Sequence, residues 1–188
     1  MELIRLHERS VAGFDRLVQQ VEPDQWDAPT PCTEWSVRDL VNHVVNENLW
    51  TPELLAGRTL EEVGDRFDGD VLGSDPLASW KASADAAVQA VQAVGDLEMM
   101  VNVSWGQIPA SEYISQLTLD HTVHGWDLAR GIGGDDEIDP ELAVFGWEYS
   151  DARRDLITGS GVFGRPIDVA EGADAQTKLL ALLGRRPE

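Results

Sequence analysis

Three residues in this sequence have the types and spacing of a metal site, and two of them share one predicted helix. Asp120 and His124 lie four positions apart in a stretch with helical periodicity, so their side chains would project from the same helix face. A buried carboxylate and imidazole are costly unless they are paired, and either a divalent cation or a mutual hydrogen bond would offset that cost. For an isolated Asp-x-x-x-His pair, the mutual hydrogen bond is the more ordinary explanation.

His43 strengthens the metal interpretation. It falls in the middle of another helical stretch, between Leu40 and Val44, where a solvated polar side chain would be misplaced. Its alternative is a histidine at the border of the core. Two histidines and one carboxylate on two packed helices would give three protein ligands, and three ligands plus water describe a catalytic rather than a structural metal site. Zinc is favoured for this divalent site, and Ni, Mn or Fe(II) would also suit these ligands.

Two more residues of the second motif could serve the site. His121 follows Asp120 directly and faces partly inward, which makes it the rival of His124 as a ligand. It could instead donate a hydrogen bond to a ligand or substrate from the rim. Asp127 lies three residues past His124, where its carboxylate could orient an imidazole. A solvated position is an equal alternative for Asp127.

The remaining reactive side chains have ordinary explanations. Cys32 has Glu34 rather than a cation near it, so nothing in the adjacent sequence lowers the pKa of the thiol, and a small buried side chain is favoured over a nucleophile. His7 is expected at the surface. Three tryptophans lie near the candidate ligands in the sequence and could either wall a pocket or pack in the core: Trp35, Trp50 and Trp126.

The elements that must position these residues are predicted to be helices. Helical periodicity, helix propensity or helix boundary signals mark the stretches 3–21, 37–55, 78–94, 109–131, 141–157 and 175–183. The stretch 99–105 alternates like a short strand or an extended link. The stretch 57–76, rich in Gly and Asp, is expected to be an exposed connection. Helices therefore far outnumber strands, and an all-α bundle with short connections is predicted.

Composition and charge favour a single domain and argue against nucleic acid as a partner. A chain of 188 residues fits a single domain spanning residues 1–188, because one hydrophobic core serves up to roughly 250 residues. The formal charge of -20 would repel a polyanion, so nucleic acid is not an expected partner. The chain has no apolar run of about 18 residues for a membrane span, and charges interrupt its N-terminus where a signal peptide would be apolar. The single cysteine cannot form an internal disulfide, so the chain does not depend on an oxidising compartment, and a cytoplasmic protein is expected.

Taken together, the two motifs resemble a known family. The segments Thr30–His43 (TPCTEWSVRDLVNH) and Asp120–Ala129 (DHTVHGWDLA) are similar to the actinobacterial DinB-like metal-binding proteins. That group is related to the N-terminal domain of mycothiol-dependent maleylpyruvate isomerase, and the resemblance covers most of the chain. It implies an all-α DinB-like four-helix bundle with short additional C-terminal helices. In that group a His and a Glu-x-x-x-His pair hold the metal, and the matching positions here are His43, Asp120 and His124, with Asp in place of Glu.

The resemblance also implies a function. An open metal position would bind and deprotonate a low-molecular-weight thiol, with mycothiol as the expected co-substrate, for transfer to or isomerisation of an electrophilic small molecule. The chain after about residue 157 is too short for the second domain of the isomerase, so maleylpyruvate isomerisation itself is not expected. The alternatives are a metal- or ligand-binding protein without turnover and a metal-dependent hydrolase. The oligomeric state stays open, a homodimer being one option.

Overall fold

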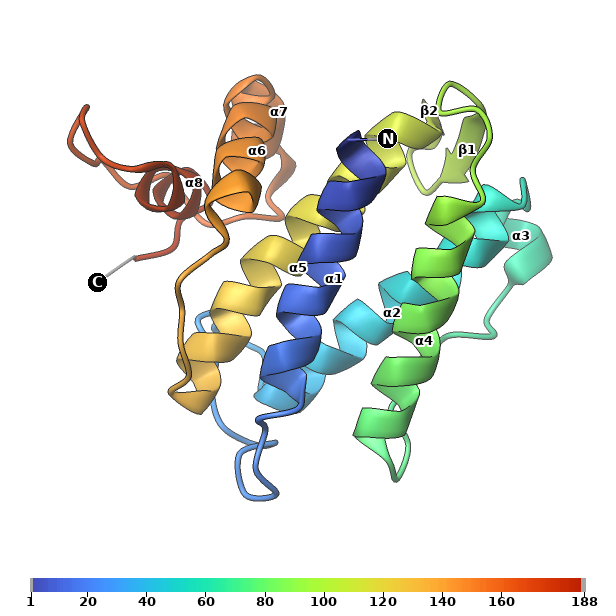
Figure 1. Cartoon of the computed structure of the whole chain (residues 1–188), viewed down its shortest axis with the longest axis horizontal. Coiled ribbons are helices and arrows are strands. Elements are labelled where there is room, and N and C mark those ends of the chain that lie inside the picture. Colours follow the sequence, from blue (N-terminus) through green and yellow to red (C-terminus); the bar gives the residue numbers. More distant parts are fainter. Residues whose placement is uncertain (1, 187–188) are drawn as a thin grey trace. The chain divides into compact units, whose positions relative to one another are not determined.

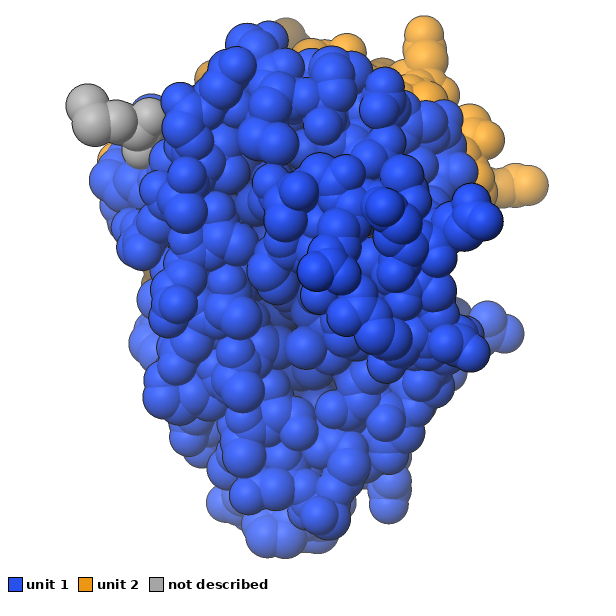
Figure 2. All heavy atoms as spheres, turned by 90° about the vertical axis from the view of Figure 1, so that its right-hand side faces the viewer, with its two compact units in different colours: residues 1–135 blue, residues 136–188 orange. Residues whose placement is uncertain are grey.

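The computed structural model describes residues 2–186, most of which are helical (Figure 1). The chain divides into two compact units, residues 1–135 and residues 136–188, which Figure 2 colours separately. Each unit is described by itself below. The expectation of one domain over residues 1–188 stays a prediction.

The first unit is built on four long helices. They are α1 (Glu2–Val18), α2 (Val37–Leu55), α4 (Pro76–Gln92) and α5 (Ala110–Ile132). Helix α5 packs against both α1 and α2, and α4 packs against both α2 and α1, which closes the four into a bundle (Figure 1). The predicted all-α, DinB-like four-helix bundle is therefore confirmed.

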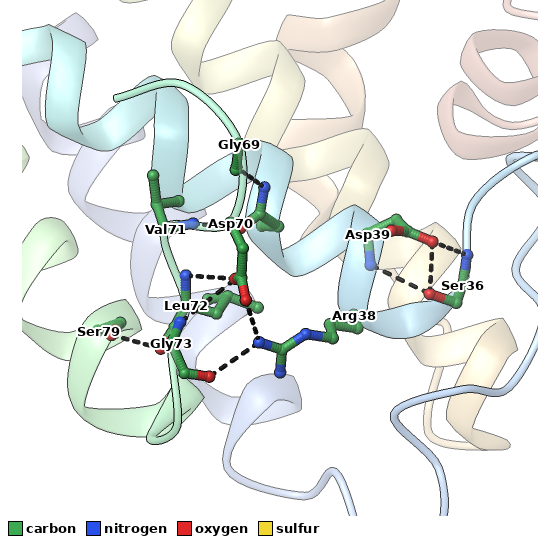
Figure 3. Close-up of polar contacts among 10 residues, drawn as sticks. Ser36, Arg38, Asp39, Gly69, Asp70, Val71, Leu72, Gly73 and Ser79 are labelled. Atoms are coloured by element: carbon green, nitrogen blue, oxygen red, sulfur yellow. Dashed lines mark hydrogen bonds and ion pairs between the residues drawn. The ribbon is translucent and has the colours of Figure 1, made fainter. Parts of the chain in front are cut away.

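Local sequence explains where α2 begins. Ser36 and Asp39 form a reciprocal cap: the Ser36 hydroxyl accepts from the Asp39 amide at 3.2 Å, and the Asp39 carboxylate accepts from the Ser36 amide at 3.0 Å (Figure 3). The predicted start of the helical stretch 37–55 is thus confirmed. Such a cap is worth about 1 kcal/mol of helix stability, and it fixes the first turn of the helix that carries His43.

The end of α5 lies slightly beyond its predicted position. Gly131, expected to stop the helix, is inside it, and Gly133 forms the left-handed cap with φ of 68°. Gly131 is needed for another reason. A Cβ atom there would lie 3.1 Å from the Val37 side chain and 3.2 Å from that of Thr30, so glycine allows the preceding loop and α2 to approach α5 closely.

The core of this unit consists of two apolar clusters. One is centred on Phe14, Val18, Leu40, Val44, Trp80 and Leu128. The other is centred on Leu54, Val91, Val101, Ile114 and Leu117. Each such side chain contributes roughly 1.5–3 kcal/mol when fully buried. Along α5, the stretch between Leu117 and Leu128 carries Asp120, His124 and Asp127, so these polar groups are held between the two clusters.

The connection between α2 and α4 is more ordered than predicted. It contains a short helix, α3 (Leu60–Val63), and the side chains of Val63 and Leu72 are buried. Most of the stretch 57–76 is exposed, as expected, but the short helix and these two buried side chains were not predicted. Its glycines and aspartates provide turns, while these two apolar residues attach it to the bundle.

A small hairpin precedes α5. Strand β1 (Met100–Val103) pairs antiparallel with β2 (Gly106–Pro109), and Val101 faces Ile108. The predicted extended stretch 99–105 thus includes one real strand. Its partner strand was not predicted.

The second unit contains α6 (Pro140–Asp151), α7 (Arg154–Ser160) and α8 (Ala175–Leu182), with α6 packed against α8. The predicted helix over 141–157 is thus two helices. The Gln176 side chain joins the start of the unit to α8, because it donates to the Asp136 carbonyl at 3.0 Å and accepts from the Ile138 amide at 2.8 Å. Across residues 2–186, none of the helices combines the length and the apolar character that a membrane span requires.

Candidate metal centre

The structure brings the three predicted ligands together from α2 and α5. His43 Nε2 lies 3.3 Å from Asp120 Oδ2, and His124 Nε2 lies 3.4 Å from Asp120 Oδ1. One ligand atom from each residue lies within 4.8 Å of the other two. Nitrogen and oxygen ligands at normal zinc distances in a tetrahedron would be about 3.3 Å apart. The separations of both imidazoles from the carboxylate therefore suit a common ion.

One oxygen of this group lacks a hydrogen bond. Asp120 Oδ2 is buried and has no hydrogen-bond partner among residues 2–186, even though His43 Nε2 is close to it. When His43 is protonated, its imidazole forms an ion pair with this oxygen at 3.3 Å, and this contact contributes to the shifted pKa values of both groups. When His43 is neutral this pairing is lost, and a buried acceptor then costs about 1–3 kcal/mol unless something else pairs with it. A cation between the carboxylate and the imidazoles would do so, and the donor set fits a divalent metal.

The pKa values show how strongly these groups interact. Burial alone would raise the pKa of Asp120, but the charges of His124 and His43 hold it well below its usual range. Burial would lower the pKa of His124, and the Asp120 charge instead raises it well above the ordinary value. The pKa of His43 is raised against burial by the same carboxylate. Without a metal the imidazoles thus favour a proton, and a metal must displace it to bind.

Asp127 orients His124 from the side away from Asp120. Its side chain is fully buried, and its Oδ2 lies 3.0 Å from His124 Nδ1. An Nδ1–H that donates to this carboxylate leaves the lone pair of Nε2 directed at Asp120 and His43. Metal-binding histidines ordinarily donate their other ring N–H to a partner of this kind, which is a carboxylate, a backbone carbonyl or water. The structure supports the orienting role for Asp127, and its alternative as a solvated residue is wrong.

Cys32 lies beside the same pair. Its thiol donates to Asp127 Oδ2 at 3.2 Å, and Sγ is 3.8 Å from His124 Nδ1. Cys32 is half-buried rather than an apolar side chain of the core. Cys32, His124 and Asp127 form a second group whose atoms could hold a metal ion. Sequence reasoning missed this group, because Cys32 is 95 positions from Asp127.

The loop before α2 holds both Cys32 and a tryptophan over the site. The amide and hydroxyl of Thr30 donate to the Trp35 carbonyl at 3.2 and 2.9 Å, and the Trp35 amide donates to the Cys32 carbonyl at 2.7 Å. The Trp35 ring lies 4.9 Å from the ring of His43 and 5.6 Å from that of His124. Trp35 therefore forms the predicted aromatic wall.

The other two tryptophans that were considered have different neighbours. The Trp50 ring packs edge-on against Phe67 at 5.7 Å. The Trp126 ring lies beneath the Arg130 guanidinium, which is 5.5 Å from its centroid. These contacts are typical of packing, which was the alternative interpretation for both residues.

The structure does not bring His121 into the group. Its ring is buried, with Nδ1 2.7 Å from the Leu117 carbonyl and Nε2 3.0 Å from Asn48 Oδ1. A carbonyl only accepts, so Nδ1 carries the proton and a neutral ring must accept at Nε2. Turning the Asn48 amide satisfies this, and it gives Nδ2 of Asn48, otherwise unpartnered within the described residues, an acceptor. Both nitrogens of His121 are thus engaged elsewhere.

His7 is buried, so its predicted surface position is wrong. Its ring packs edge-on against His121 at 5.6 Å, and neither ring nitrogen has a hydrogen-bond partner in the described part of the chain. Burial, and then the charge of His121, lower the pKa of His7 to about 3. The spacing of His7 to Val11 and Phe14, four and seven positions on, was the signal that places it on the inner face of α1.

Glu47 is the acid that sequence reasoning missed. It lies one helical turn after His43 on α2, on the same side of the helix. Burial is the main cause that raises the pKa of Glu47, and the charge of Asp120 raises it further. Its carboxyl interacts electrostatically with all three predicted ligands, so it faces the centre from the α2 side. Its spacing to His43 was the available signal.

Hydrogen bonds also join α2 to the connection that follows it. The Arg38 guanidinium donates to the Asp70 carboxylate at 2.8 Å, and the Asn42 side chain accepts from the Val71 amide at 2.8 Å (Figure 3). Arg38 and Asn42 lie one helical turn apart, and Asn42 directly precedes His43. These contacts hold the part of α2 that presents His43.

Comparison with known proteins places the bundle in a family. Residues 7–129 match the family described as mycothiol maleylpyruvate isomerase N-terminal domain. The chain belongs to this family. The match includes Cys32, all three predicted ligands and Asp127, and it ends before the second compact unit. Together with the convergent side chains, the family indicates a DinB-like, divalent-metal-binding domain related to the mycothiol isomerase.

Two relatives are uncharacterized proteins of Mycobacterium tuberculosis, from the strains CDC 1551 / Oshkosh and H37Rv. Each is 34% identical to this chain over 144 residues, which are 77% of this chain and 75% of the relative. No solved structure matches the chain significantly.

Proposed function

We propose that this protein holds one divalent metal ion with His43, Asp120 and His124 and uses it to activate a low-molecular-weight thiol. The observation that carries the proposal is the convergence of two imidazole nitrogens on the half-buried carboxylate of Asp120, whose Oδ2 atom is itself buried and accepts no hydrogen bond from residues 2–186 in the geometry of the structure. Three protein ligands leave a coordination position for a substrate. Zinc suits the donors best, and Ni, Mn or Fe(II) are alternatives.

The charge of the donor set favours an anionic substrate group. Two neutral imidazoles and the Asp120 carboxylate would leave a bound dication with one uncompensated positive charge. A thiolate at the open position neutralises it, whereas a neutral group does not. When bound, the ion lowers the pKa of a coordinating thiol so that a nucleophile exists near neutral pH without a protein cysteine.

The residues around the ligands have separate tasks in this proposal. Asp127 keeps the proton of His124 on Nδ1, so that Nε2 stays available as a ligand. Trp35 covers the rings of His43 and His124 and limits access of water to them. Glu47, whose carboxyl is made more basic by burial and by Asp120, accepts the proton that the incoming thiol releases.

The family description suggests which thiol and which class of reaction to test. That description names mycothiol, which makes mycothiol the first thiol to test. The reaction class is transfer of the thiol to an electrophilic small molecule, or isomerisation through a reversible addition of that thiol. The formal charge of -20 argues against nucleic acid as an alternative substrate.

The test compares metal-loaded and metal-free protein in consuming mycothiol with a chromogenic electrophile. We expect faster loss of thiol with the loaded protein, and loss of that advantage in Asp120→Asn. Asp85→Asn, at an exposed carboxylate paired with Lys81, is the matched control and should behave as wild type. Equal rates for loaded and metal-free protein with every electrophile would overturn the catalytic proposal and leave a binding protein. Product formed without thiol would indicate hydrolysis instead.

A further inference from the structure

The imidazole of His124 lies between two donor sets. Its Nε2 faces Asp120 at 3.4 Å, and its Nδ1 faces Asp127 at 3.0 Å and the sulfur of Cys32 at 3.8 Å. We infer that Cys32, Asp127 and His124 Nδ1 form a second metal position that takes thiophilic dications such as Cd²⁺. This position is separate from the thiol chemistry proposed above, and it does not use His43 or Asp120.

The distances fit a sulfur-containing site. A tetrahedral ion with normal Zn–S, Zn–N and Zn–O bonds separates its ligand atoms by about 3.3–3.6 Å. Here the three separations are 3.2 Å from Cys32 Sγ to Asp127 Oδ2, 3.8 Å from Sγ to His124 Nδ1, and 3.0 Å from that nitrogen to Asp127 Oδ2. Shifts of a few tenths of an ångström would bring all three atoms to one ion.

The two positions offer different donor atoms and should therefore prefer different classes of metal ion. Thiolate is a soft ligand and selects soft ions, whereas the position at His43 and Asp120 offers only nitrogen and oxygen. Binding of a dication would replace the thiol proton of Cys32 and the Nδ1 proton of His124, and both protons would be released to solvent. The thiolate, the Asp127 carboxylate and a neutral imidazole then balance the two charges of the ion. A neutral assembly suits this place, because the Asp127 side chain is fully buried.

The two positions exclude each other at His124. A neutral imidazole has one nitrogen free to bind and one that carries a proton. An ion at Nε2 keeps the proton on Nδ1, where Asp127 accepts it. An ion at Nδ1 leaves the proton on Nε2, where Asp120 Oδ1 is 3.4 Å away. A thiophilic ion would therefore displace the ion of the first position rather than add to it.

Titration of the full chain with Cd²⁺ tests this inference. Cys32 is the only cysteine, so ultraviolet thiolate-to-cadmium charge-transfer absorption reports on it alone. We expect the absorption to saturate at one Cd²⁺ per chain and to persist in His43→Ala. In Cys32→Ser it should vanish, while Mn²⁺ affinity, which depends on the first position, should remain within twofold of wild type. Zinc-loaded protein should release one Zn²⁺ for each Cd²⁺ bound.

Three results would overturn the inference. One is saturation with Cd²⁺ without thiolate absorption, and another is equal Cd²⁺ affinity in wild type and Cys32→Ser. The third is simultaneous binding of one Zn²⁺ and one Cd²⁺ to each chain, which would show that His124 does not divide the positions. Circular dichroism of each variant establishes that it is folded. Because the readout needs neither thiol substrate nor turnover, its failure is distinguishable from failure of the proposed function.

Discussion

The four histidines of this chain form two pairs whose surroundings have opposite effects. His43 and His124 lie on either side of Asp120, with side chains 29% and 11% exposed. His7 and His121 pack ring to ring in the interior, where both are essentially unexposed. The carboxylate raises the pKa of each histidine in the first pair, whereas burial lowers the pKa of each in the second.

The comparison shows what makes a histidine pair a metal site. Both pairs have imidazoles on neighbouring helices, but the first adds a carboxylate between the two rings and partial exposure to solvent. The second pair is neutral and behaves as part of the core: the ring of His121 also packs edge-on against Phe14 at 6.2 Å and Trp80 at 6.3 Å. Attraction to a charge outweighs desolvation in one place, and desolvation dominates in the other.

Single replacements of histidines from the two pairs should give the largest difference in metal binding. We expect His43→Ala and His124→Ala each to abolish metal binding, because each removes a direct ligand. His121→Ala should largely retain it, since the ring of His121 is engaged with Leu117 and Asn48. Competition with a chromophoric chelator measures the affinities. Equal losses in His121→Ala and His124→Ala would contradict the division into two pairs.

The carboxylate that distinguishes the first pair is tested by Asp120→Asn. The neutral amide oxygen is a poorer ligand, so metal affinity should fall by more than the roughly 100-fold that loss of an outer partner causes. Asp120→Glu should retain measurable affinity, because the charge is kept and the longer side chain can still reach. Isothermal titration of both variants provides the comparison. Unchanged affinity in Asp120→Asn would remove Asp120 from the site.

A smaller effect is expected from the residue that orients His124. Asp127→Asn keeps the shape of the side chain and weakens the acceptor for the Nδ1 proton, so metal affinity should fall by about 10 to 100-fold. The same titration measures this change, with Asp85→Asn as an exposed control. A loss as large as that of Asp120→Asn would mean that Asp127 itself coordinates the ion of the first position.

The buried pair, His7 and His121, should affect stability at acid pH and leave metal binding unchanged. Above pH 6.5 His7 is neutral in both the folded and the unfolded chain. Between pH 6.5 and about 3 only the unfolded chain takes up the proton at His7, so the contribution of His7 to stability falls by about 1.4 kcal/mol per pH unit. His7→Met should flatten this loss, by about 1.4 kcal/mol at pH 5.5, without changing metal affinity at pH 7. Urea unfolding at pH 7.5 and 5.5 checks it, and parallel curves for both proteins would show that His7 titrates normally.

Much of the bundle was predictable because it depends on local periodicity. The apolar spacing and the helix boundary signals placed α1, α2, α4 and α5 within a few residues of their observed bounds. Contacts between distant segments were not predictable in this way. The burial of Leu72 and the pairing of β1 with β2 depend on what lies opposite each segment in three dimensions.

The same limit applies to the candidate site. The four-residue spacing of Asp120 and His124 identified two neighbours on one helix, and His43 was added to them from its position among apolar residues of a second helix and from the family resemblance. The contact of Cys32 with Asp127 spans 95 positions and has no local signature. His7 had the spacing of an inner-face residue on α1, but its polar character favoured the surface. Whether a buried histidine is stable depends on its neighbours, which the spacing alone does not reveal.

Metal analysis of protein purified without chelators tests the central claim most directly. Elemental analysis of wild type beside His43→Ala, with uptake titrations of both after metal removal, gives the stoichiometry at the first position. We predict close to one divalent ion per chain in wild type and none retained at that position in His43→Ala. Wild-type protein that contains no transition metal and takes none up on titration would contradict the account.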